Sequence, residues 1–347
     1  MERFELRAAS FEQADRSQHV DIFEQMPLGE KKLIQQIQRA ARGGAAVVKG
    51  IGDDCAVLRV PGGHEVLITT DFSIEKVHFR RDWHPPEVVG WRCLTRGLSD
   101  IAAMGGEPLA AFLSLAVAGD VPQKWVDRFL RGLLELAKEF GISLAGGDTA
   151  QSAGGIQADI VVVGSVPRGK AVLRSGAKVG DAIYVTGELG GAAAELGRRR
   201  EAKSVGNLGR AFRASRDSKC YSRPQARVAV GRWLRERGVA SAMIDLSDGL
   251  STDLEHICQE SHVGAEIDAE AIPRAWVGKE AVGLDLALHG GDDYELLFTS
   301  GAAVPGEITG VRVTCIGRVG RFAGMRLVVD GKARRLKAAG WEHFRAR

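Results

Sequence analysis

The feature that most constrains this chain is a series of short acidic motifs, each placed at the edge of an apolar run. The motifs are Gly50-Ile51-Gly52-Asp53-Asp54, Thr69-Thr70-Asp71, Leu98-Ser99-Asp100, Gly146-Gly147-Asp148-Thr149, Asp245-Leu246-Ser247-Asp248-Gly249 and Gly290-Gly291-Asp292-Asp293. Loops at the ends of strands are where a fold commonly gathers its functional residues. The series therefore predicts that carboxylates from distant parts of the chain meet at one end of a sheet.

Composition narrows the class of protein. A chain of 347 residues is longer than one hydrophobic core usually serves, so the length predicts two domains. The formal net charge of +3 gives no reason to expect a nucleic acid or a membrane as a partner. Five scattered cysteines without a C-x-x-C pair favour reduced thiols and a cytoplasmic protein over a disulfide framework or a zinc site. Residues 1–25 lack the apolar core of a secretory signal, and the apolar run 109–119 is too short to span a bilayer.

Apolar periodicity predicts alternating helices and strands. In the first half we expect helices from Leu28 to Arg42, Pro85 to Gly105 and Pro122 to Gly141, and strands at 57–60, 65–70, 109–117, 142–145 and 156–166. In the second half we expect strands at 182–186, 241–246, 265–267, 294–299 and 311–317, and helices from about Gly191, over 225–237 and over 250–261. Asp71 and Asp148 would then directly follow strands, and Asp100 would lie in the last turn of a helix.

These elements predict an α/β fold of mixed α+β type, in which the acidic loops of two domains face each other. Pro167-Arg168-Gly169 is interpreted as the link between the domains. We expect an N-terminal extension over 1–26, an N-terminal domain over 27–167 and a C-terminal domain over 168–347.

Carboxylates without His or Cys at ligand spacing indicate a hard cation that prefers oxygen ligands. Mg²⁺ suits best, because it is commonly shared between a few carboxylates and phosphate oxygens. Glycine-rich turns add backbone N–H groups that can approach a phosphate. The sequence contains neither a Walker A loop nor a Rossmann G-x-G-x-x-G motif. The combination predicts nucleotide-dependent phosphoryl transfer at a phosphate-binding site that has neither of these two motifs.

Taken in order, the motifs carry a resemblance to a known family. Gly50–Ala56, Thr69–Asp71, His78, Leu98–Gly105, Gly146–Thr149, Arg174–Lys178, Ile244–Leu250 and Gly290–Leu296 resemble the thiamine-monophosphate kinase family, which belongs to the group that includes aminoimidazole ribonucleotide synthetase and selenophosphate synthetase. The resemblance implies ATP-dependent phosphorylation of thiamine monophosphate to thiamine diphosphate with several Mg²⁺ ions. It also implies an aminoimidazole ribonucleotide synthetase-like architecture whose N-terminal sheet forms the interface of a homodimer.

The resemblance further implies a role for individual residues. Metal would be bound by Asp54, Thr69, Thr70, Asp71, Asp100, Asp148, Asp245 and Asp248, ATP would be contacted by Gly147, Asp148, Arg174 and Ser247, and thiamine monophosphate by His78, Asp292 and Trp341. No general base is expected, because a phosphate acceptor is already ionised near neutral pH. The family usually carries Glu at the position of Asp292, so this side chain is one methylene shorter.

Each motif also has a simpler interpretation when it is taken alone. Arg96 and Asp100 would form an i,i+4 surface pair, Gly146–Thr149 a hairpin turn, and Asp245–Gly249 a helix start capped by Ser247 or Asp248. The basic run between Arg198 and Lys219 is interpreted as a solvated loop, because aromatic residues that could stack on bases are scarce there. The alternative functions are another ATP-dependent synthetase of the same superfamily, a nucleotide-binding regulator without turnover, and an RNA binder.

Overall fold

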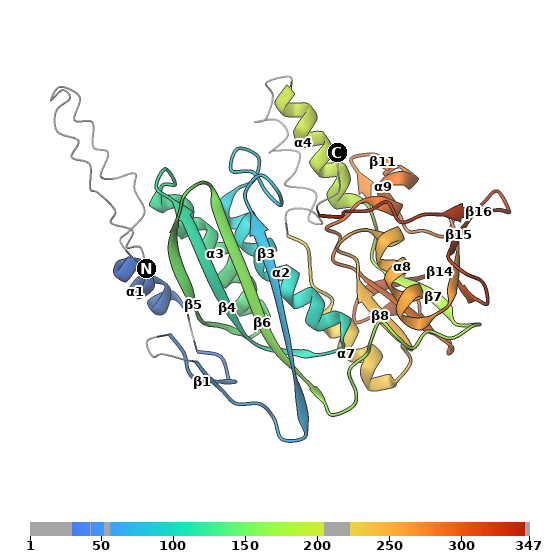
Figure 1. Ribbon diagram of the computed structural model, residues 1–347, viewed down its shortest axis with the longest axis horizontal. Helices are drawn as coiled ribbons and strands as arrows, with labels where there is room; N and C mark the ends of the chain where they lie inside the picture. The colour runs from blue at the N-terminus through green and yellow to red at the C-terminus, as the bar shows by residue number, and fades with distance from the viewer. Residues whose placement is uncertain (1–29, 42, 52–55, 205–222, 344–347) are drawn as a thin grey trace, which may run out of the picture.

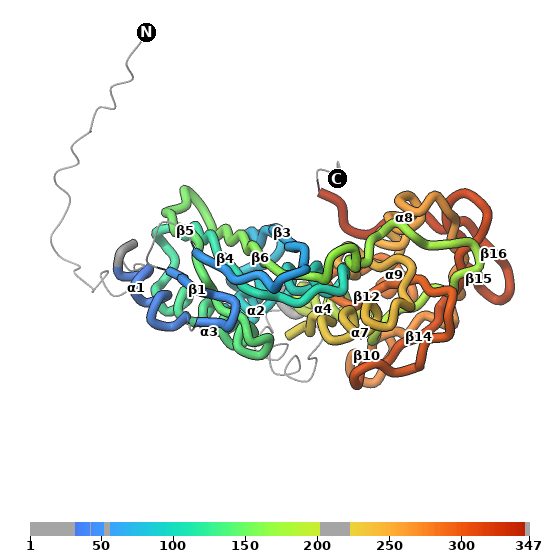
Figure 2. The backbone as a smooth tube through the Cα atoms, turned by 90° about the horizontal axis from the view of Figure 1, so that it is seen from below, coloured from blue at the N-terminus to red at the C-terminus, as the bar shows by residue number. Residues whose placement is uncertain are grey.

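The structure is a computed structural model that describes residues 30–41, 43–51, 56–204 and 223–343. Two large sheets organise it, one built by the first half of the chain and one by the second (Figure 1). Seen from below, the two halves lie side by side along the long axis (Figure 2). The extension 1–26, Asp54 and most of the basic run lie outside the described residues.

The first half is a four-stranded sheet with helices on one face. Its elements are α1 (Glu30–Ala40), β1 (Val47–Lys49), β2 (Val57–Leu58), β3 (His64–Ile74), α2 (Pro86–Ala103), β4 (Glu107–Ala118), α3 (Gln123–Glu139), β5 (Ser143–Ser152) and β6 (Ile156–Pro167). The strand order is β3-β6-β4-β5, and α2 and α3 lie behind this sheet in Figure 1, leaving its other face open. The predicted boundaries of the two long helices are confirmed to within two residues at each end.

The second half is an eight-stranded sheet with further helices. Its elements are β7 (Ala182–Thr186), α4 (Gly191–Ser204), α7 (Val228–Arg237), β8 (Ala242–Asp245), α8 (Leu250–Ser261), β9 (Gly264–Asp268), β10 (Trp276–Val277), β11 (Glu280–Ala281), α9 (Leu284–His289), β12 (Leu296–Ser300), β13 (Glu307–Ile308), β14 (Val311–Gly320), β15 (Met325–Val329) and β16 (Lys332–Leu336). The β9–β15 pair is parallel, whereas β7 pairs with both of its neighbours in the antiparallel direction. The mixed α/β fold class is confirmed.

Two strands run further than predicted, and this decides where site residues point. β3 was expected to end at Thr70, but it pairs with β6 as far as Ile74 opposite Gln157. β5 was expected to end before Gly146, but it pairs with β4 as far as Ser152 opposite Ala118. The prediction that these two acidic motifs form loops at strand ends is wrong, and so is the hairpin alternative for the second. Long-range pairing with β6 and β4 outweighs the local turn signal.

Helix α2 contacts both halves at very short range. A Cβ atom added to Gly90 on α2 would lie 1.9 Å from the carbonyl oxygen of Phe129 on α3, and one added to Gly231 on α7 would lie 2.0 Å from that of Ala102 on α2. One hydrophobic cluster accordingly contains residues of both halves, and the division at residue 167 stays a prediction. In the described part of the chain, no helix is long and apolar enough to cross a membrane.

The crossing of α2 and α3 provides a test of this packing. A Cβ atom at Gly132 would lie 2.0 Å from the carbonyl oxygen of Glu87, so we expect Gly132→Ala to lower the free energy of unfolding by roughly 2 kcal/mol or more. Chemical denaturation measures this loss. Gly62→Ala is the control, because a Cβ atom added there would meet no other atom within 4 Å. Equal stabilities of the two variants would contradict the close crossing.

Candidate active site

Three carboxylates from both halves meet near the carboxyl end of α2. Asp71 lies on β3, Asp100 lies in the last turn of α2, and Asp245 is the last residue of β8. The Thr69 hydroxyl donates a short hydrogen bond to Asp100, and the Ser99 hydroxyl donates to Asp245 at 2.8 Å. The expectation that acidic segments of the two halves face each other is therefore confirmed.

The electrostatics of this acidic cluster favour a bound cation. Burial first, and then the neighbouring carboxylates, raise the pKa of Asp71 to about 6 and that of Asp245 to about 7. Burial also raises the pKa of Asp100, while the charge of Arg174 opposes the rise at Asp100 and Asp245. A cation would stabilise the ionised forms, and a donor set made only of oxygen fits Mg²⁺.

The donor set is incomplete within the described residues. No three His, Cys, Asp or Glu side chains among them are already spaced to hold a metal ion, and Asp54 lies outside the description. Mg²⁺ normally keeps several waters and takes further oxygens from phosphate, so it does not need a preformed protein cage. Asp71, Asp100 and Asp245 therefore fit a Mg²⁺ site that is completed by water, substrate and further ligands.

Thr70 and Asp148 point away from this cluster. Neighbouring residues of a strand alternate between faces, so Thr70 lies on the open face of the sheet while Asp71 lies on the face that α2 covers. The Thr70 hydroxyl donates to Asp159 at 2.7 Å, and Asp148 lines a groove with the same Asp159. This arrangement separates the side chains of Thr70 and Asp148 from Asp71, and their roles as metal ligands stay predictions.

A cavity of about 580 Å³ lies beside Gly147 and Asp148. Its walls include Ile34, Ile37, Ile51, Phe112 and Leu115, together with both glycines of the Gly146–Thr149 motif. Gly147 has a φ of 148°, and a Cβ atom there would lie 1.9 Å from the carbonyl oxygen of Leu113, so only glycine fits. The Thr149 hydroxyl is buried and has no partner among the described residues. A flat heterocycle with polar edges suits such a cavity.

A second cluster surrounds Asp292. Its carboxylate lies 2.7 Å from Nη2 of Arg92 and 3.2 Å from Nη2 of Arg96, and it accepts a hydrogen bond of 2.6 Å from the Tyr294 hydroxyl. Burial opposes ionisation here, but the charges of Arg92 and Arg96 outweigh it and lower the pKa of Asp292 to about 2. Arg96 also reaches Asp71 at 3.5 Å and so joins the two clusters. The interpretation of Arg96 as a surface partner of Asp100 is wrong.

The predicted substrate residues His78 and Trp341 both contact His343. The His343 ring contacts each of them edge-on, with ring centroids 5.5 Å apart in both cases. The backbone N–H of Ile74 donates to Nδ1 of His78 at 3.0 Å, so the neutral ring carries its proton on Nε2. Burial first and the charge of Arg96 second lower the pKa of His78 to about 4. His78 therefore offers a neutral N–H donor at pH 7.

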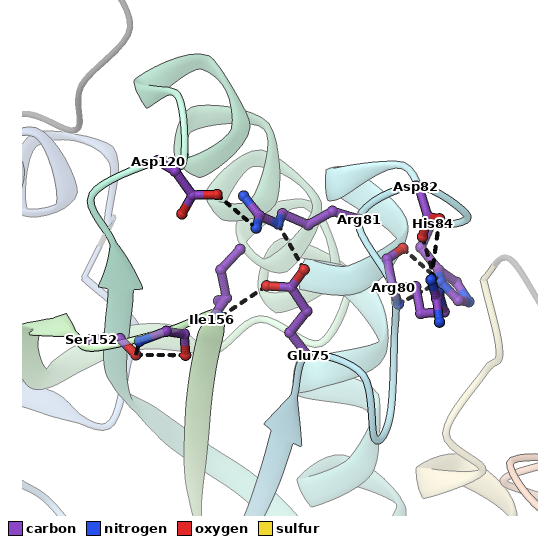
Figure 3. A network of polar contacts seen from close by, with 9 residues as sticks. Glu75, Arg80, Arg81, Asp82, His84, Asp120, Ser152 and Ile156 are labelled. Atoms are coloured by element: carbon purple, nitrogen blue, oxygen red, sulfur yellow. Dashed lines mark hydrogen bonds and ion pairs between the residues drawn. The ribbon is translucent and has the colours of Figure 1, made fainter.

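The loop that carries His78 is braced by charged side chains (Figure 3). Glu75, at the end of β3, accepts from Nε of Arg81 at 2.7 Å and from the backbone N–H of Ile156 at 3.1 Å. Arg81 also donates to Asp120 at 3.0 Å, which ties the loop to the end of β4. These contacts attach the loop that carries His78 to β6 and to the segment that follows β4.

The 245–249 motif is held by backbone contacts. The N-cap of α8 is Gly249, and Asp253 accepts from the N–H groups of Asp248 and Gly249, so capping by Ser247 or Asp248 is wrong. The carbonyl of Ser247 accepts from the N–H of Asp292 at 2.8 Å, and the carbonyl of Asp248 accepts from the N–H of Trp341 at 2.9 Å. The motif therefore holds both of these predicted substrate residues in place.

The start of the basic run is a helix rather than a loop, since α4 extends to Ser204. Arg199 is buried and donates to the carbonyl of Trp83 at 2.6 Å, whereas Arg198 is exposed and donates to the carbonyl of Val277 at 2.7 Å. The interpretation as a loop is therefore wrong for both residues, and the interpretation as solvated is wrong for Arg199. Their contacts attach α4 to the loop that follows β3 and to the β10–β11 hairpin.

Sequence reasoning assigned no site role to Arg92, Arg96, Tyr294 or His343. Arg92 and Arg96 lie one turn apart on a helix whose other positions are mostly buried, and a charged pair on such a helix is a signal for a buried ion-pair partner. Tyr294 directly follows the Asp292–Asp293 motif, and His343 lies two residues after Trp341. The partners themselves come from remote segments, which no local pattern identifies.

The chain was compared with known proteins. Residues 52–166 match the family model "AIR synthase related protein, N-terminal domain", and residues 178–313 match the corresponding C-terminal domain. A thiamine-monophosphate kinase of Escherichia coli O157:H7 is 37% identical over 334 residues, covering 92% of this chain and 99% of the relative. One from Bacillus subtilis (strain 168) is 35% identical, covering 78% and 83%.

Solved structures agree with these relatives. A thiamine-monophosphate kinase from Stenotrophomonas maltophilia K279a has a TM-score of 0.75 at 34% identity, covering 87% of this chain and 96% of its own. The structure of AaThiL complexed with AMPPCP and TMP has a TM-score of 0.69 at 31% identity, covering 90% and 96%. The hydrogenase maturation protein HypE of E. coli, at 20% identity and a TM-score of 0.70, covers 90% and 98% and shares the fold.

The raised pKa of Asp245 predicts a dependence of stability on pH. Its pKa is about 7 in the folded state against an ordinary value of 3.8, so folding favours the protonated form and stability falls as the pH rises from 3.8 to about 7. In metal-free protein, the melting temperature of Asp245→Asn minus that of the parent protein is expected to be larger at pH 8 than at pH 5. Thermal unfolding in chelator at both pH values measures this difference.

The control is Asp330→Asn, because Asp330 is exposed and no ion pair to it is found among the described residues, so its effect should not change with pH. If the melting temperatures of Asp245→Asn and the parent protein change in parallel between pH 5 and pH 8, Asp245 does not carry a raised pKa.

Proposed function

The chain belongs to the thiamine-monophosphate kinases of the AIR synthase related family, and on this premise we propose that it transfers a phosphoryl group from ATP to thiamine monophosphate. The products are thiamine diphosphate and ADP. The observation that carries the proposal is the meeting of the acidic cluster with the His78–His343–Trp341 ring contacts, joined through Arg96 and Asp292. A phosphate held near the carboxylates and an aromatic cation held near the rings would occupy one continuous site.

The reaction mainly requires that the donor and acceptor phosphates be positioned and that their charge be neutralised. Donor and acceptor are both phosphate anions, and two unit charges about 4 Å apart repel by roughly 4 kcal/mol at an effective dielectric of 20. Mg²⁺, when bound, supplies the positive charge that offsets this repulsion. Asp71, Asp100 and Asp245 would hold it, and Thr69 and Ser99 orient two of these carboxylates. No side chain needs to remove a proton, because the acceptor phosphate is already ionised.

The nucleotide would bind beside Gly147. The cavity there has apolar walls for a purine ring, and the Gly146–Thr149 motif lines its side. Asp148 also lines this cavity, which supports its proposed role toward ATP. Arg174 acts on Asp100 and Asp245 through its charge and would face the phosphates.

We propose a homodimer formed through the open face of the four-stranded sheet. Val66, Ile68 and Phe72 alternate along β3 on that face and are 48%, 70% and 54% exposed. Apolar side chains grouped in this way on a sheet face are typical of a protein interface. We also place the protein in the cytoplasm, since Cys93, Cys258 and Cys315 are free thiols.

The kinase proposal is tested by product analysis. Purified protein with ATP, Mg²⁺ and thiamine monophosphate is expected to form thiamine diphosphate and an equal amount of ADP, and to form none without Mg²⁺. Asp71→Asn is expected to lower kcat by about 100-fold or more, because one anionic metal ligand is lost. Asp285→Asn, at an exposed position, should keep the parent kcat.

The outcomes separate the alternatives. ATP binding without any product from thiamine monophosphate, selenide or an aminoimidazole precursor would indicate a regulator without turnover. Product from another acceptor would indicate a different synthetase of the superfamily. Full activity of Asp71→Asn would remove the proposed metal site while leaving the kinase assignment intact.

The dimer proposal has its own test. Ile68→Glu places a charge in the centre of the proposed interface and is expected to convert the dimer to a monomer in sedimentation velocity. Val179→Glu is the matched control, since Val179 is also an exposed apolar residue, at 49%, but lies in the second half. A parent protein that sediments as a monomer, or an Ile68→Glu variant that stays dimeric, would contradict this interface.

A further inference from the structure

The carboxylate of Asp292 is fully engaged within the protein. Its Oδ1 faces Arg96 and the Tyr294 hydroxyl, and its Oδ2 faces Arg92 at 2.7 Å. Two guanidinium groups already supply more positive charge than this carboxylate carries. A cationic ring that approached Asp292 would therefore meet net positive charge and would have to displace a buried arginine. The surroundings of Asp292 suit an anion better than a cation.

Arg96 has N–H donors without a partner among the described residues. Its guanidinium lies 5.9 Å from the centre of the Tyr294 ring, and its two ion pairs in the described part of the chain, to Asp71 at 3.5 Å and to Asp292 at 3.2 Å, use Nη1 and Nη2 at the long end of the hydrogen-bonding range. No partner of its Nε–H is found among the described residues. A guanidinium presents five N–H donors in a planar fork that matches phosphate oxygens. Arg96 thus combines charge, free donors and a position between the metal-binding and substrate-binding groups.

The backbone beneath Asp292 is held in a conformation that aims it at α2. Asp292 and Tyr294 have φ values of 69° and 54°, in the left-handed region that side chains with a Cβ rarely adopt. Hydrogen bonds from the N–H groups of both residues, to the carbonyls of Ser247 and Leu246, hold this strained turn in place. Strain of this kind persists where the surrounding structure requires one geometry. Here that geometry brings the carboxylate of Asp292 to Arg92 and Arg96.

We propose that Arg96 binds the phosphate of the acceptor substrate, and that Asp292 is a positioning residue that acts through Arg96 rather than a ligand of the thiazolium ring. The proposal rests on the function proposed above and deepens it. The acceptor phosphate would lie between Arg96 and the ion held by Asp71, Asp100 and Asp245. The cationic ring would lie toward Trp341 and His343, where aromatic faces rather than a carboxylate stabilise it. Asp292, one methylene shorter than the family's usual Glu, still reaches both arginines.

The test compares a ligand that carries the phosphate with one that lacks it. Calorimetric titrations with thiamine monophosphate and with thiamine are made on the protein loaded with Mg²⁺ and AMPPCP. Arg96→Gln is expected to weaken binding of thiamine monophosphate by roughly tenfold or more, the usual scale for a lost charge-assisted contact, and to change thiamine binding less than twofold. Arg96→Lys keeps the charge but loses the fork, so its loss for thiamine monophosphate should be smaller.

Asp292 is tested in the same titrations. Asp292→Asn is expected to weaken the binding of thiamine monophosphate more than the binding of thiamine. The double variant Arg96→Gln, Asp292→Asn should bind thiamine monophosphate no more weakly than Arg96→Gln alone, because both substitutions act on one contact. Arg128→Gln is the matched control, since it breaks an arginine–glutamate pair of 2.6 Å with Glu87, away from the site. The melting temperatures of all variants show whether they are folded. If Arg96→Gln does not fold, Arg96→Lys is used for the test.

Two results would overturn the proposal. Thiamine monophosphate could bind Arg96→Gln and Arg96→Lys as tightly as it binds the parent protein, or Asp292→Asn could weaken thiamine as much as thiamine monophosphate, which would show direct contact with the ring. The proposed function fails separately, if the parent protein forms no thiamine diphosphate. An active parent with unaffected Arg96 variants would refute only the role of Arg96.

Discussion

The close packing of helix α2 is the constraint on which the rest of the structure depends. Glycines at its contacts allow the backbones of neighbouring helices to approach closely. Gly90 of α2 packs against α3, and Gly231 of α7 packs against Ala102 of α2. A Cβ atom at Gly97 would lie 2.5 Å from Val162 on the sheet. A helix fixed on three sides moves little, and it carries Arg92, Arg96, Ser99 and Asp100 to the site. The two halves of the molecule therefore meet around one rigid element, and the site is formed where they meet.

The site contains two clusters of opposite electrostatic character. The acidic cluster concentrates carboxylates that repel one another, and their pKa values rise, so this arrangement costs stability until a cation binds. The cluster around Asp292 contains more arginine than carboxylate, and the pKa of Asp292 falls. Arg96 contacts both clusters. It allows the acidic cluster, whose carboxylates repel one another, to lie next to the cluster around Asp292, whose opposite charges attract. Such a junction suits a reaction in which anionic groups must be brought together and held between positive charges.

Local sequence patterns predicted the elements but not the directions of all side chains. The long helices, the mixed fold and the meeting of Asp100 with Asp245 followed from periodicity and from the placement of acidic motifs. The faces of Thr70 and Asp148 did not, because the lengths of β3 and β5 are set by pairing with remote strands rather than by the glycines and threonines of the motifs. The partners of Arg96 were missed for the same reason, since Asp71 and Asp292 reach it from positions 25 and 196 residues away along the chain.

The unbroken course of β3 through its acidic motif has a consequence for how such a chain can vary over evolutionary time. Thr69 and Asp71 point toward α2, whereas Ile68 and Thr70 point to the open face. Insertion or deletion of one residue within the strand would exchange the two sets, removing ligands from the acidic cluster and placing a carboxylate among apolar surface residues at once. Substitutions can be tolerated one at a time along this strand, but a change in its length cannot. Variation in chain length should therefore accumulate in the turn before His64, which leaves the register untouched.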